Sequence, residues 1–339
     1  MRVTFIADPH IPVPPIGYGG AERNAALICE ELARRGHEVR LLAGAGSRNY
    51  GELWVHQAPS ANFHSRVYRK ISFQLTSLRA ALDSDVVHSI GRVDYLWSLL
   101  HTRVPLVLTL QNHAPKAELL KLAGSRSRVA LVSPSDAYRR ELPPARWTTI
   151  YNTVDSRRIE FTAEPSGNYL AFLGRLTANK GVHTAIQVAQ HADLPLIIAG
   201  NIPDEPGGPE FFEREVRPHL GGKIEWIGEI DDVRKPEFLG NARALLFPIQ
   251  WEEPFGMVVA ESFAAGTPVI AMRRGAMPEV IEPGRNGFLC DSVTDMVEAV
   301  RRINELDRAY CRQTCDDRYS PRVAVDRYLD VYADVVREQ

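Results

Sequence analysis

The stretch that decides the fold is Pro248-Ile249-Gln250-Trp251-Glu252-Glu253-Pro254-Phe255-Gly256-Met257-Val258-Val259-Ala260-Glu261-Ser262. It follows an apolar run, Ala244–Phe247, that predicts a buried strand, and it leads through a turn into a helical segment ending near Ala265. The first N–H groups of such a helix lack helical partners and carry the positive end of its dipole, which suits a phosphate-bearing ligand. Glu253 and Glu261 bracket this turn, so we expect them to bind separate parts of one extended ligand.

Length and composition describe a two-domain globular protein. The chain has 339 residues, of which 45% are hydrophobic and 24% charged, enough for two cores of ordinary size. No apolar run is long enough to span a bilayer, and residues 1–7 read as a first strand rather than a signal peptide. We therefore expect a cytoplasmic protein. Its four cysteines lack the paired spacing of a zinc site, and in that compartment we expect them to be reduced thiols.

The net charge of −2 hides an asymmetry between the two halves. Residues 1–155 carry 19 Lys and Arg against 13 Asp and Glu, a net charge of +6, whereas residues 156–339 carry 21 against 29, a net charge of −8. This division argues against a nucleic-acid-binding protein and suits a first domain that meets anionic acceptors or a membrane surface. Within it, residues 66–82 form a basic amphipathic pattern, which indicates either a solvated helix face or contact with a lipid-linked acceptor or an anionic membrane.

The amino-terminal residues predict a strand–helix–strand opening of the doubly wound α/β type. Strand-like Val3–Ala7 is followed by a helical pattern at Ala21–Arg35 and a second strand at Glu38–Ala43. The glycines between them do not match the G-x-G-x-x-G fingerprint of dinucleotide-binding proteins. Gly19 and Gly20 either let the backbone approach a phosphate closely or simply permit a turn.

Polar side chains follow two further strands of the first half. His88 ends the run from Asp85, and Gln111 and His113 follow the strand Val104–Leu110. Residues at the carboxyl ends of parallel strands point toward the region where such sheets bind ligands. We therefore take these three side chains as candidates for contact with an acceptor or a transferred sugar.

Two cations follow the first strand of the second half. Arg175 and Lys180 lie after the strand Tyr169–Leu173. Arginine makes paired hydrogen bonds to phosphate oxygens, and lysine supplies a compact charge. The adjacent acids Asp231 and Asp232 could indicate a metal site, but acids before a helix are more often caps, and we assign no metal.

These motifs together resemble those of one enzyme family. Glu253-Pro254-Phe255-Gly256 followed by Glu261 resembles the E-x7-E signature of the retaining glycosyltransferases of family 4, which have the GT-B fold. Ordered matches extend from Gly19 to Gly287 and cover almost the whole chain. They include Gly-Gly-x-Glu at 19–22, Asn-Thr-Val-Asp at 152–155, Gly-Arg at 174–175, Lys-Gly at 180–181, Gly-Ala-Met-Pro-Glu at 275–279 and Asn-Gly-Phe-Leu at 286–289.

The resemblance implies two Rossmann-like domains that face each other across a cleft. Residues 1–155 would form the acceptor-side domain and residues 156–321 the domain that binds the nucleotide sugar, with 162–168 as the linker. The last helix, about 322–339, would pack back on the first domain.

The resemblance also implies roles for single residues. Glu253 would bind the hydroxyls of the donor sugar, Glu261 the ribose, and Arg175 with Lys180 the diphosphate. The donor-binding set implied is Gly19, Gly20, Gly200, Asn201, Ile230, Phe255, Gly256, Met257, Val258 and Glu261. The family has Thr-x-His where this chain has Thr109-Leu110-Gln111, so either His113 or Gln111 would take the histidine's place near the reacting carbon.

The function implied is transfer of a sugar from a nucleotide diphosphate sugar to an acceptor hydroxyl, with retention and without a metal or cofactor. One alternative is a nucleotide-sugar 2-epimerase of related fold, which would rearrange the donor without an acceptor. Another is a non-catalytic protein that binds the donor and releases no nucleoside diphosphate. Neither the donor nor the acceptor is defined by the sequence.

Overall fold

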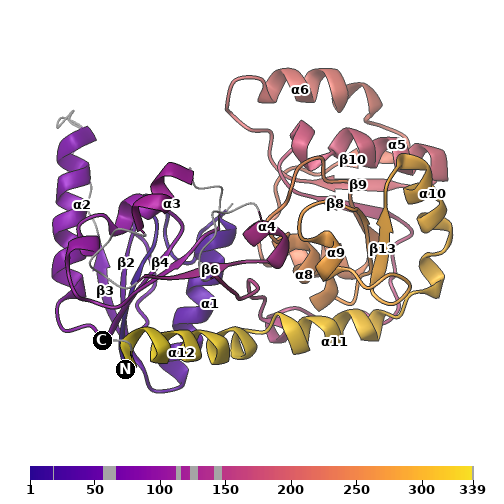
Figure 1. Cartoon of the computed structure of the whole chain (residues 1–339). Coiled ribbons are helices and arrows are strands. Elements are labelled where there is room, and N and C mark those ends of the chain that lie inside the picture. The colour runs from indigo at the N-terminus through magenta and orange to yellow at the C-terminus, as the bar shows by residue number, and fades with distance from the viewer. Residues whose placement is uncertain (18, 56–65, 112–115, 123–128, 141–146, 338–339) are drawn as a thin grey trace. The chain divides into compact units, whose positions relative to one another are not determined.

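A computed structural model describes all of the chain except residues 18, 56–65, 112–115, 123–128, 141–146 and 338–339 (Figure 1). The chain forms two compact units: Met1–Thr153 together with Pro321–Gln339, and Val154–Ser320. The segment 162–168, expected to be a linker, is instead fixed within the second unit. The Thr162 N–H donates to Ala265 O and the Gly167 N–H donates to Asn241 O, each at 3.1 Å.

The first unit is built on a parallel sheet. Its strands are β1 (Arg2–Ile6), β2 (Glu38–Ala43), β3 (Glu52–Val55), β4 (Val86–Ile90), β5 (Leu106–Thr109), β6 (Val129–Ser133) and β7 (Trp147–Thr149). They lie in the order β3-β2-β1-β4-β5-β6-β7, and each neighbouring pair is parallel. The order reverses between β1 and β4, which confirms the predicted doubly wound class.

Helices cover both faces of this sheet (Figure 1). One face carries α1 (Gly20–Arg34) and α12 (Pro321–Arg337), and the other carries α2 (Arg66–Ala81), α3 (Lys116–Leu122), α4 (Asp136–Arg140) and the 3₁₀ turns η1 (Val93–Leu96) and η2 (Leu99–His101). Successive strand residues alternate between the two cores: Phe5 packs with α1 and α12, whereas Ile6 packs with α2. This alternation explains why the strands read as continuous apolar runs.

A buried histidine joins α12 to the sheet. The Nδ1 atom of His88 lies 2.7 Å from the Tyr332 hydroxyl, and its Nε2 atom lies 2.8 Å from Oγ1 of Thr109. The ring is fully buried, and desolvation lowers the pKa of His88 to about 3. The expectation that His88 contacts an acceptor or a sugar is therefore wrong, because both ring nitrogens are used inside the core.

The second unit repeats the same design with six strands. They are β8 (Leu170–Leu173), β9 (Leu196–Ala199), β10 (Ile224–Trp226), β11 (Ala244–Phe247), β12 (Val269–Met272) and β13 (Gly287–Cys290). Their order is β10-β9-β8-β11-β12-β13, again with every neighbouring pair parallel. The point where the order reverses lies between β8 and β11.

The helices of the second unit pack on each other as well as on the sheet. They are η3 (Ser156–Arg158), η4 (Ala178–Lys180), α5 (Val182–Ala192), α6 (Gly208–Glu215), η5 (Arg217–His219), α7 (Lys235–Gly240), α8 (Met257–Ala264), α9 (Met277–Val280), α10 (Val293–Arg301), η6 (Ile303–Glu305) and α11 (Arg308–Arg318). Two arginines of α11 donate to carbonyls at the ends of neighbouring helices: Arg308 to Gly240 O at 2.6 Å and Arg312 to Ala264 O at 2.7 Å. These carbonyls have no partner within their own helices, so the guanidinium groups fix where α7 and α8 end.

Among the helices that the structure describes, none combines the length and the apolar character needed to cross a bilayer.

Candidate functional site

The candidate donor site lies at the carboxyl edge of the second sheet. The chain leaves β8 through Gly174 and Arg175, and it leaves β11 into the loop that carries Glu253. These two strands are neighbours at the point where the strand order reverses. In doubly wound sheets this point is where ligands bind, because the loops on either side diverge and leave room.

Lys180 and Glu253 form the centre of this site. The Lys180 Nζ atom lies 2.5 Å from Oε2 of Glu253, which also accepts from the indole N–H of Trp251 at 2.9 Å. Nζ lies 5.3 Å from the centroid of the Trp251 ring, within the range of a cation–π contact. Both charged side chains are largely buried. The structure thus joins two predicted residues that are distant in sequence, and it adds Trp251, which the sequence analysis had not assigned a role.

The loop after β12 supports the backbone of Glu253. The Ala276 N–H donates to Glu253 O at 2.9 Å, and the Gly275 N–H donates to the Glu252 carboxylate at 2.6 Å. Gly275 has φ +53°, and a Cβ atom on it would lie 2.3 Å from both N and O of Glu253. Only glycine allows this approach. The Gly-Ala-Met-Pro-Glu match in the sequence therefore marks a support for the Glu253 loop.

Glu261 is paired with a lysine that the sequence analysis missed. Lys235, the first residue of α7, places its Nζ atom 2.7 Å from Oε1 of Glu261 and 3.0 Å from Oδ1 of Asp232. The side chains of Lys235 and Glu261 are 13% and 12% exposed, so their charges are held together away from most water. No spacing in the sequence relates positions 235 and 261, which lie on different helices.

The start of α8 presents backbone donors to the same region. Gly256 is the N-cap residue, no side chain caps the helix, and Met257 and Val258 are partly exposed at its first turn. Phe255 is buried and packs edge-to-face on Tyr319 with ring centroids 5.3 Å apart. Of the predicted residues in this turn, Phe255 is buried and Gly256 has no side chain, so both shape the backbone and neither offers a side chain to a ligand.

Arg175 and the ends of β9 and β10 complete the carboxyl edge. Arg175 is partly buried and forms an ion pair with Glu205, which precedes α6. At the end of β9, Gly200 has φ +149°, and a Cβ atom there would lie 1.8 Å from the Gly174 carbonyl oxygen. The Leu176 N–H donates to Asn201 O at 3.0 Å. Backbone bonds thus hold the residues at and after the end of β9, among them the predicted donor-binding residue Asn201, against the loop of Arg175.

The two acids that follow β10 have different partners. The Asp231 carboxylate accepts from the backbone N–H groups of Val233 and Arg234, at 3.1 and 2.9 Å. It therefore caps the turn that precedes α7, as predicted for an acid before a helix. The buried Ile230 lies just before it. Among the described residues there is no group of three or more His, Cys, Asp or Glu placed to hold a metal ion.

The remaining predicted site residues belong to the first unit, and the described ones lie at the start of α1 and after β5. Gly19 is the N-cap of α1 and Gly20 its first residue. The Gln111 amide is engaged by Asn152 in a reciprocal pair: Gln111 Nε2 donates to Asn152 Oδ1 at 2.7 Å, and Asn152 Nδ2 donates to Gln111 Oε1 at 2.8 Å. Gln111 therefore serves to fix the end of β5 to the segment after β7. His113 lies outside the described residues.

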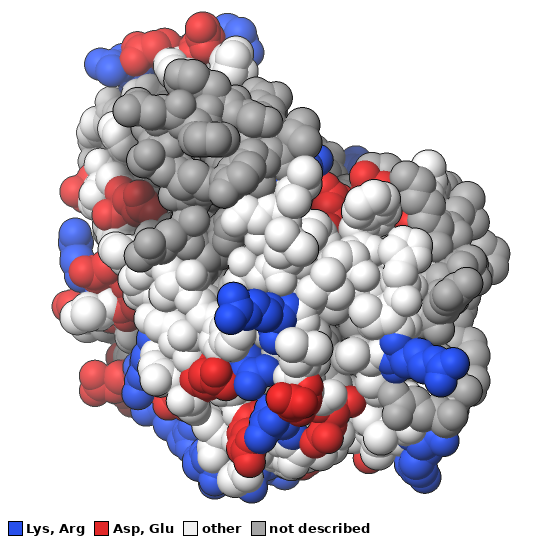
Figure 2. Space-filling view, turned by 90° about the vertical axis from the view of Figure 1, so that its left-hand side faces the viewer, with Lys and Arg blue, Asp and Glu red and all other residues white. Residues whose placement is uncertain are grey.

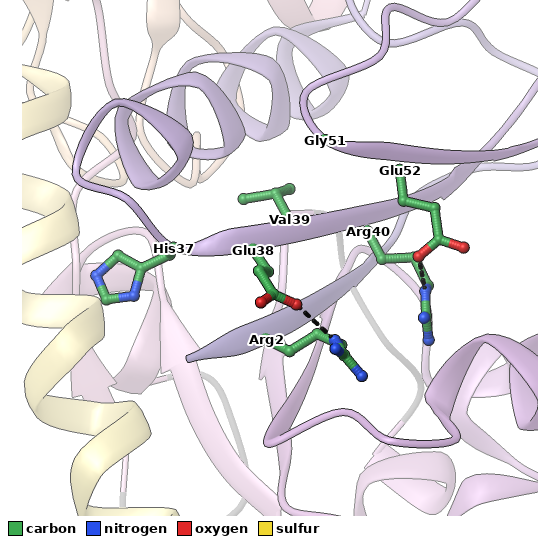
Figure 3. Close-up of a pocket in the computed structure, with 7 residues that line it drawn as sticks. All are labelled: Arg2, His37, Glu38, Val39, Arg40, Gly51 and Glu52. Carbon is green, nitrogen blue, oxygen red and sulfur yellow. Dashed lines mark hydrogen bonds and ion pairs between the residues drawn. The ribbon is translucent and has the colours of Figure 1, made fainter.

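A separate hollow of about 350 Å³ lies at the amino-terminal edge of the first sheet (Figure 3). Its cations face carboxylates of the same hollow: Arg2 pairs with Glu38 at 2.8 Å and Arg40 with Glu52 at 2.7 Å (Figure 3). It contains none of the predicted site residues, and its charges already satisfy one another. We do not assign it to the donor site.

Comparison with known proteins covers nearly all of the chain. Residues 18–158 match the family model described as Glycosyltransferase Family 4, and residues 155–314 match the model described as glycosyl transferases group 1. Alpha-maltose-1-phosphate synthase of Mycolicibacterium smegmatis is 26% identical over 99% of this chain and 100% of its own length.

Solved structures show the same fold. AviGT4, a glycosyltransferase involved in avilamycin A biosynthesis, is 25% identical with a TM-score of 0.76, over 100% of this chain and 99% of that chain. HepE of Anabaena, solved in complex with UDP-glucose, has a TM-score of 0.76 at 16% identity, over 98% of this chain and 100% of that chain. At that identity the second likeness shows the fold alone.

Two doubly wound units, one with cations and carboxylates gathered at its strand reversal, define a glycosyltransferase of the GT-B fold. The two family models together extend from residue 18 to residue 314. The chain belongs to the group 1 glycosyltransferases of family 4.

Proposed function

We propose that this enzyme transfers a sugar from a nucleotide diphosphate donor to an acceptor hydroxyl, with retention of the anomeric configuration and without a metal ion. The observation that carries the proposal is the pairing of Lys180 with Glu253 at the strand reversal of the second unit, where Arg175 follows β8. Membership of the group 1 glycosyltransferases of family 4 supports a nucleotide sugar as donor.

The cations act on the leaving group. As the bond between sugar and phosphate breaks, negative charge grows on the diphosphate, so fixed positive charges stabilise the transition state more than the ground state. Lys180 has three N–H donors, and its bond to Glu253 occupies one of them. It can therefore hold Glu253 in place while donating to a phosphate oxygen. Arg175 would supply the second cation, and this fixed charge is our reason to propose that no divalent metal takes part.

The carboxylates act on the sugars. Glu253 would accept hydrogen bonds from hydroxyls of the transferred sugar. The N–H groups of Met257 and Val258, at the start of α8, would donate beside it. Glu261 would accept hydrogen bonds from the ribose hydroxyls through Oε2, because its Oε1 is paired with Lys235. The acceptor would attack on the face that the leaving group vacates, and a phosphate oxygen of the donor would take its proton. His113 would lie near the reacting carbon.

The test begins with a thermal-shift screen of nucleotide sugars and continues with turnover of the donor that binds. We expect a product of unchanged anomeric configuration by NMR, and activity that resists chelators. Lys180→Met should lower kcat by about 10²-fold or more, as for loss of a group that stabilises transition-state charge. Lys223→Met is the matched control. Lys223 also pairs with a carboxylate, that of Asp193, but it precedes β10 and therefore lies at the amino-terminal edge of the second sheet, away from the donor site. An inverted product, loss of activity with chelators, or rearrangement of the donor without acceptor would contradict the corresponding part of the proposal.

We also infer that the first unit meets an anionic partner at a membrane, either the lipid surface or a lipid-linked acceptor. The net charge of +6 on residues 1–155 supports this.

A further inference from the structure

Helix α2 is apolar on two opposite sides. Phe73 and Ala80 are buried in the core of the first unit. Ile71, Leu75 and Leu82, in contrast, are 53%, 60% and 62% exposed. The spacing of four residues places Ile71 and Leu75 on one side of the helix, away from Phe73, and Leu82 is the residue that follows its last turn. A helix that only covered the sheet would carry polar residues on that side.

A further exposed apolar side chain, that of a tryptophan, lies in a segment that contacts α2. Trp97 is 64% exposed and lies beside η1. Its segment is tied to α2 through Gln74, which accepts from the Ser98 N–H at 2.8 Å and donates to Asp94 O at 2.6 Å. We call Ile71, Leu75, Leu82 and Trp97 the α2 apolar face.

The charge of the helix is of one sign. Residues 66–81 contain four basic residues and no acidic one, which gives a net charge of +4: Arg66, Arg69, Lys70 and Arg79. Lys70 lies 4.0 Å from Asp94 with both side chains well exposed, a pair that neutralises little. Figure 2, seen from the side where α2 lies in Figure 1, shows an uncharged area with both basic and acidic groups around it.

We propose that the α2 apolar face docks on an anionic lipid bilayer, with its aliphatic side chains and Trp97 in the boundary between headgroups and acyl chains. Exposed aliphatic residues, a tryptophan and an excess of basic residues on the helix are the combination that binds such an interface. A second copy of the chain does not fit, because two helices of charge +4 would repel each other. The face makes the membrane contact inferred above specific, and it is separate from the donor residues of the second unit.

The test is co-sedimentation of the full chain at low salt with vesicles of equal parts phosphatidylglycerol and phosphatidylcholine, and with phosphatidylcholine alone. The wild type should sediment with the anionic vesicles only. The double variant Ile71→Gln/Leu75→Gln should lose about ten-fold or more of its partitioning, because it removes aliphatic groups that would be buried. Val233→Gln is the control: Val233 is an exposed aliphatic residue of the second unit, and its loss should leave partitioning unchanged.

Three outcomes would overturn the proposal. They are a wild type that stays in the supernatant with anionic vesicles, a double variant that binds as well as the wild type, and a wild type that binds neutral vesicles equally well. Light scattering adds a fourth: a dimeric wild type that the double variant converts to a monomer would make the face an interface between copies. The thermal shift with nucleotide sugar, measured on all three proteins, reports the donor site independently and should be the same in each.

Discussion

At Glu253 one carboxylate oxygen receives both the Lys180 ammonium and the Trp251 indole N–H, while the backbone of the same residue is held by the loop of Gly275. The side chain is therefore fixed at both ends before a donor arrives. A site whose groups are already placed has less reorganisation to complete during the reaction. The Gly275 contact is the part that a single added methyl group can disturb.

Gly275→Ala should lower kcat at least ten-fold or so, because its Cβ atom would collide with the Glu253 backbone and shift the carboxylate. The control is Gly222→Ala. Gly222 has a similar φ of +58° but no atom within 4 Å of the added group, so it should lose only the backbone cost of about 1–2 kcal/mol. Steady-state rates and unfolding midpoints of both variants check this. Equal kcat values in the two variants would contradict the role given to Gly275.

Lys235→Met should weaken binding of the nucleoside diphosphate about ten-fold, which corresponds to about 1.4 kcal/mol. The substitution removes the cation that is paired with Glu261. Because Glu261 is mostly buried, its unpaired carboxylate would no longer be held in place for the ribose. Calorimetric titration measures the Kd, and Lys235→Arg should restore most of the affinity. If the methionine variant unfolds at a lower temperature yet binds the nucleotide with the wild-type Kd, Lys235 is structural only.

At the scale of elements, α12 is held to the sheet of the first unit by polar as well as apolar contacts. Tyr328 and Tyr332 are both fully buried, and their hydroxyls reach Thr109 and His88. Thr109 in turn contacts the other nitrogen of His88. The four side chains form one buried network, so the docking of α12 depends on an uncharged His88.

The first unit should therefore lose stability on mild acidification. The pKa of His88 is about 3 in the folded protein because of burial, against an ordinary value near 6.5 in the unfolded chain. Between these values the unfolded state binds a proton that the folded state does not, so the free energy of unfolding falls as the pH drops through this window. From pH 7 to pH 4 we expect a loss on the order of 3 kcal/mol from this group.

Denaturant unfolding at several pH values measures this loss. His88→Gln should be less stable than the wild type at pH 7 but should lack this part of the acid sensitivity. His191→Gln, a change at an exposed histidine of α5, should keep the wild-type pH dependence. An unchanged pH profile in the His88 variant would contradict the assignment.

At the scale of the whole molecule, the predicted donor-binding residues other than Gly19 and Gly20 belong to the second unit. Their positions depend on contacts within that unit, such as those of Lys235 and Gly275. Binding of a nucleoside diphosphate should therefore be a property of residues 154–320.

Hydrogen exchange measured with and without a nucleoside diphosphate should show protection in peptides that contain 174–181 and 248–262. Ligands slow exchange where they suppress local opening. The same experiment on Glu261→Ala, at equal ligand concentration, should show reduced protection because less of the protein is bound. Protection that spares 248–262 in the wild type would place the nucleotide elsewhere.

Much of the fold was predictable from local pattern. The strands of both sheets are buried apolar runs with helices between them, which is the signature of a parallel sheet covered on both sides. The exceptions are informative: β3 and the short β7 lie at the edges of the first sheet, where burial is weaker and the apolar pattern fades.

The sequence by itself determined the fold class, the family and the residue types of the donor site, because strand periodicity and the spacing of Glu253 and Glu261 are local properties of the chain. Only the tertiary structure decided which charges meet. It paired Lys180 with Glu253 and Lys235 with Glu261, and it buried His88 between β5 and α12. Partners that lie on different elements are brought together by the packing of those elements, and no pattern along the chain records that distance.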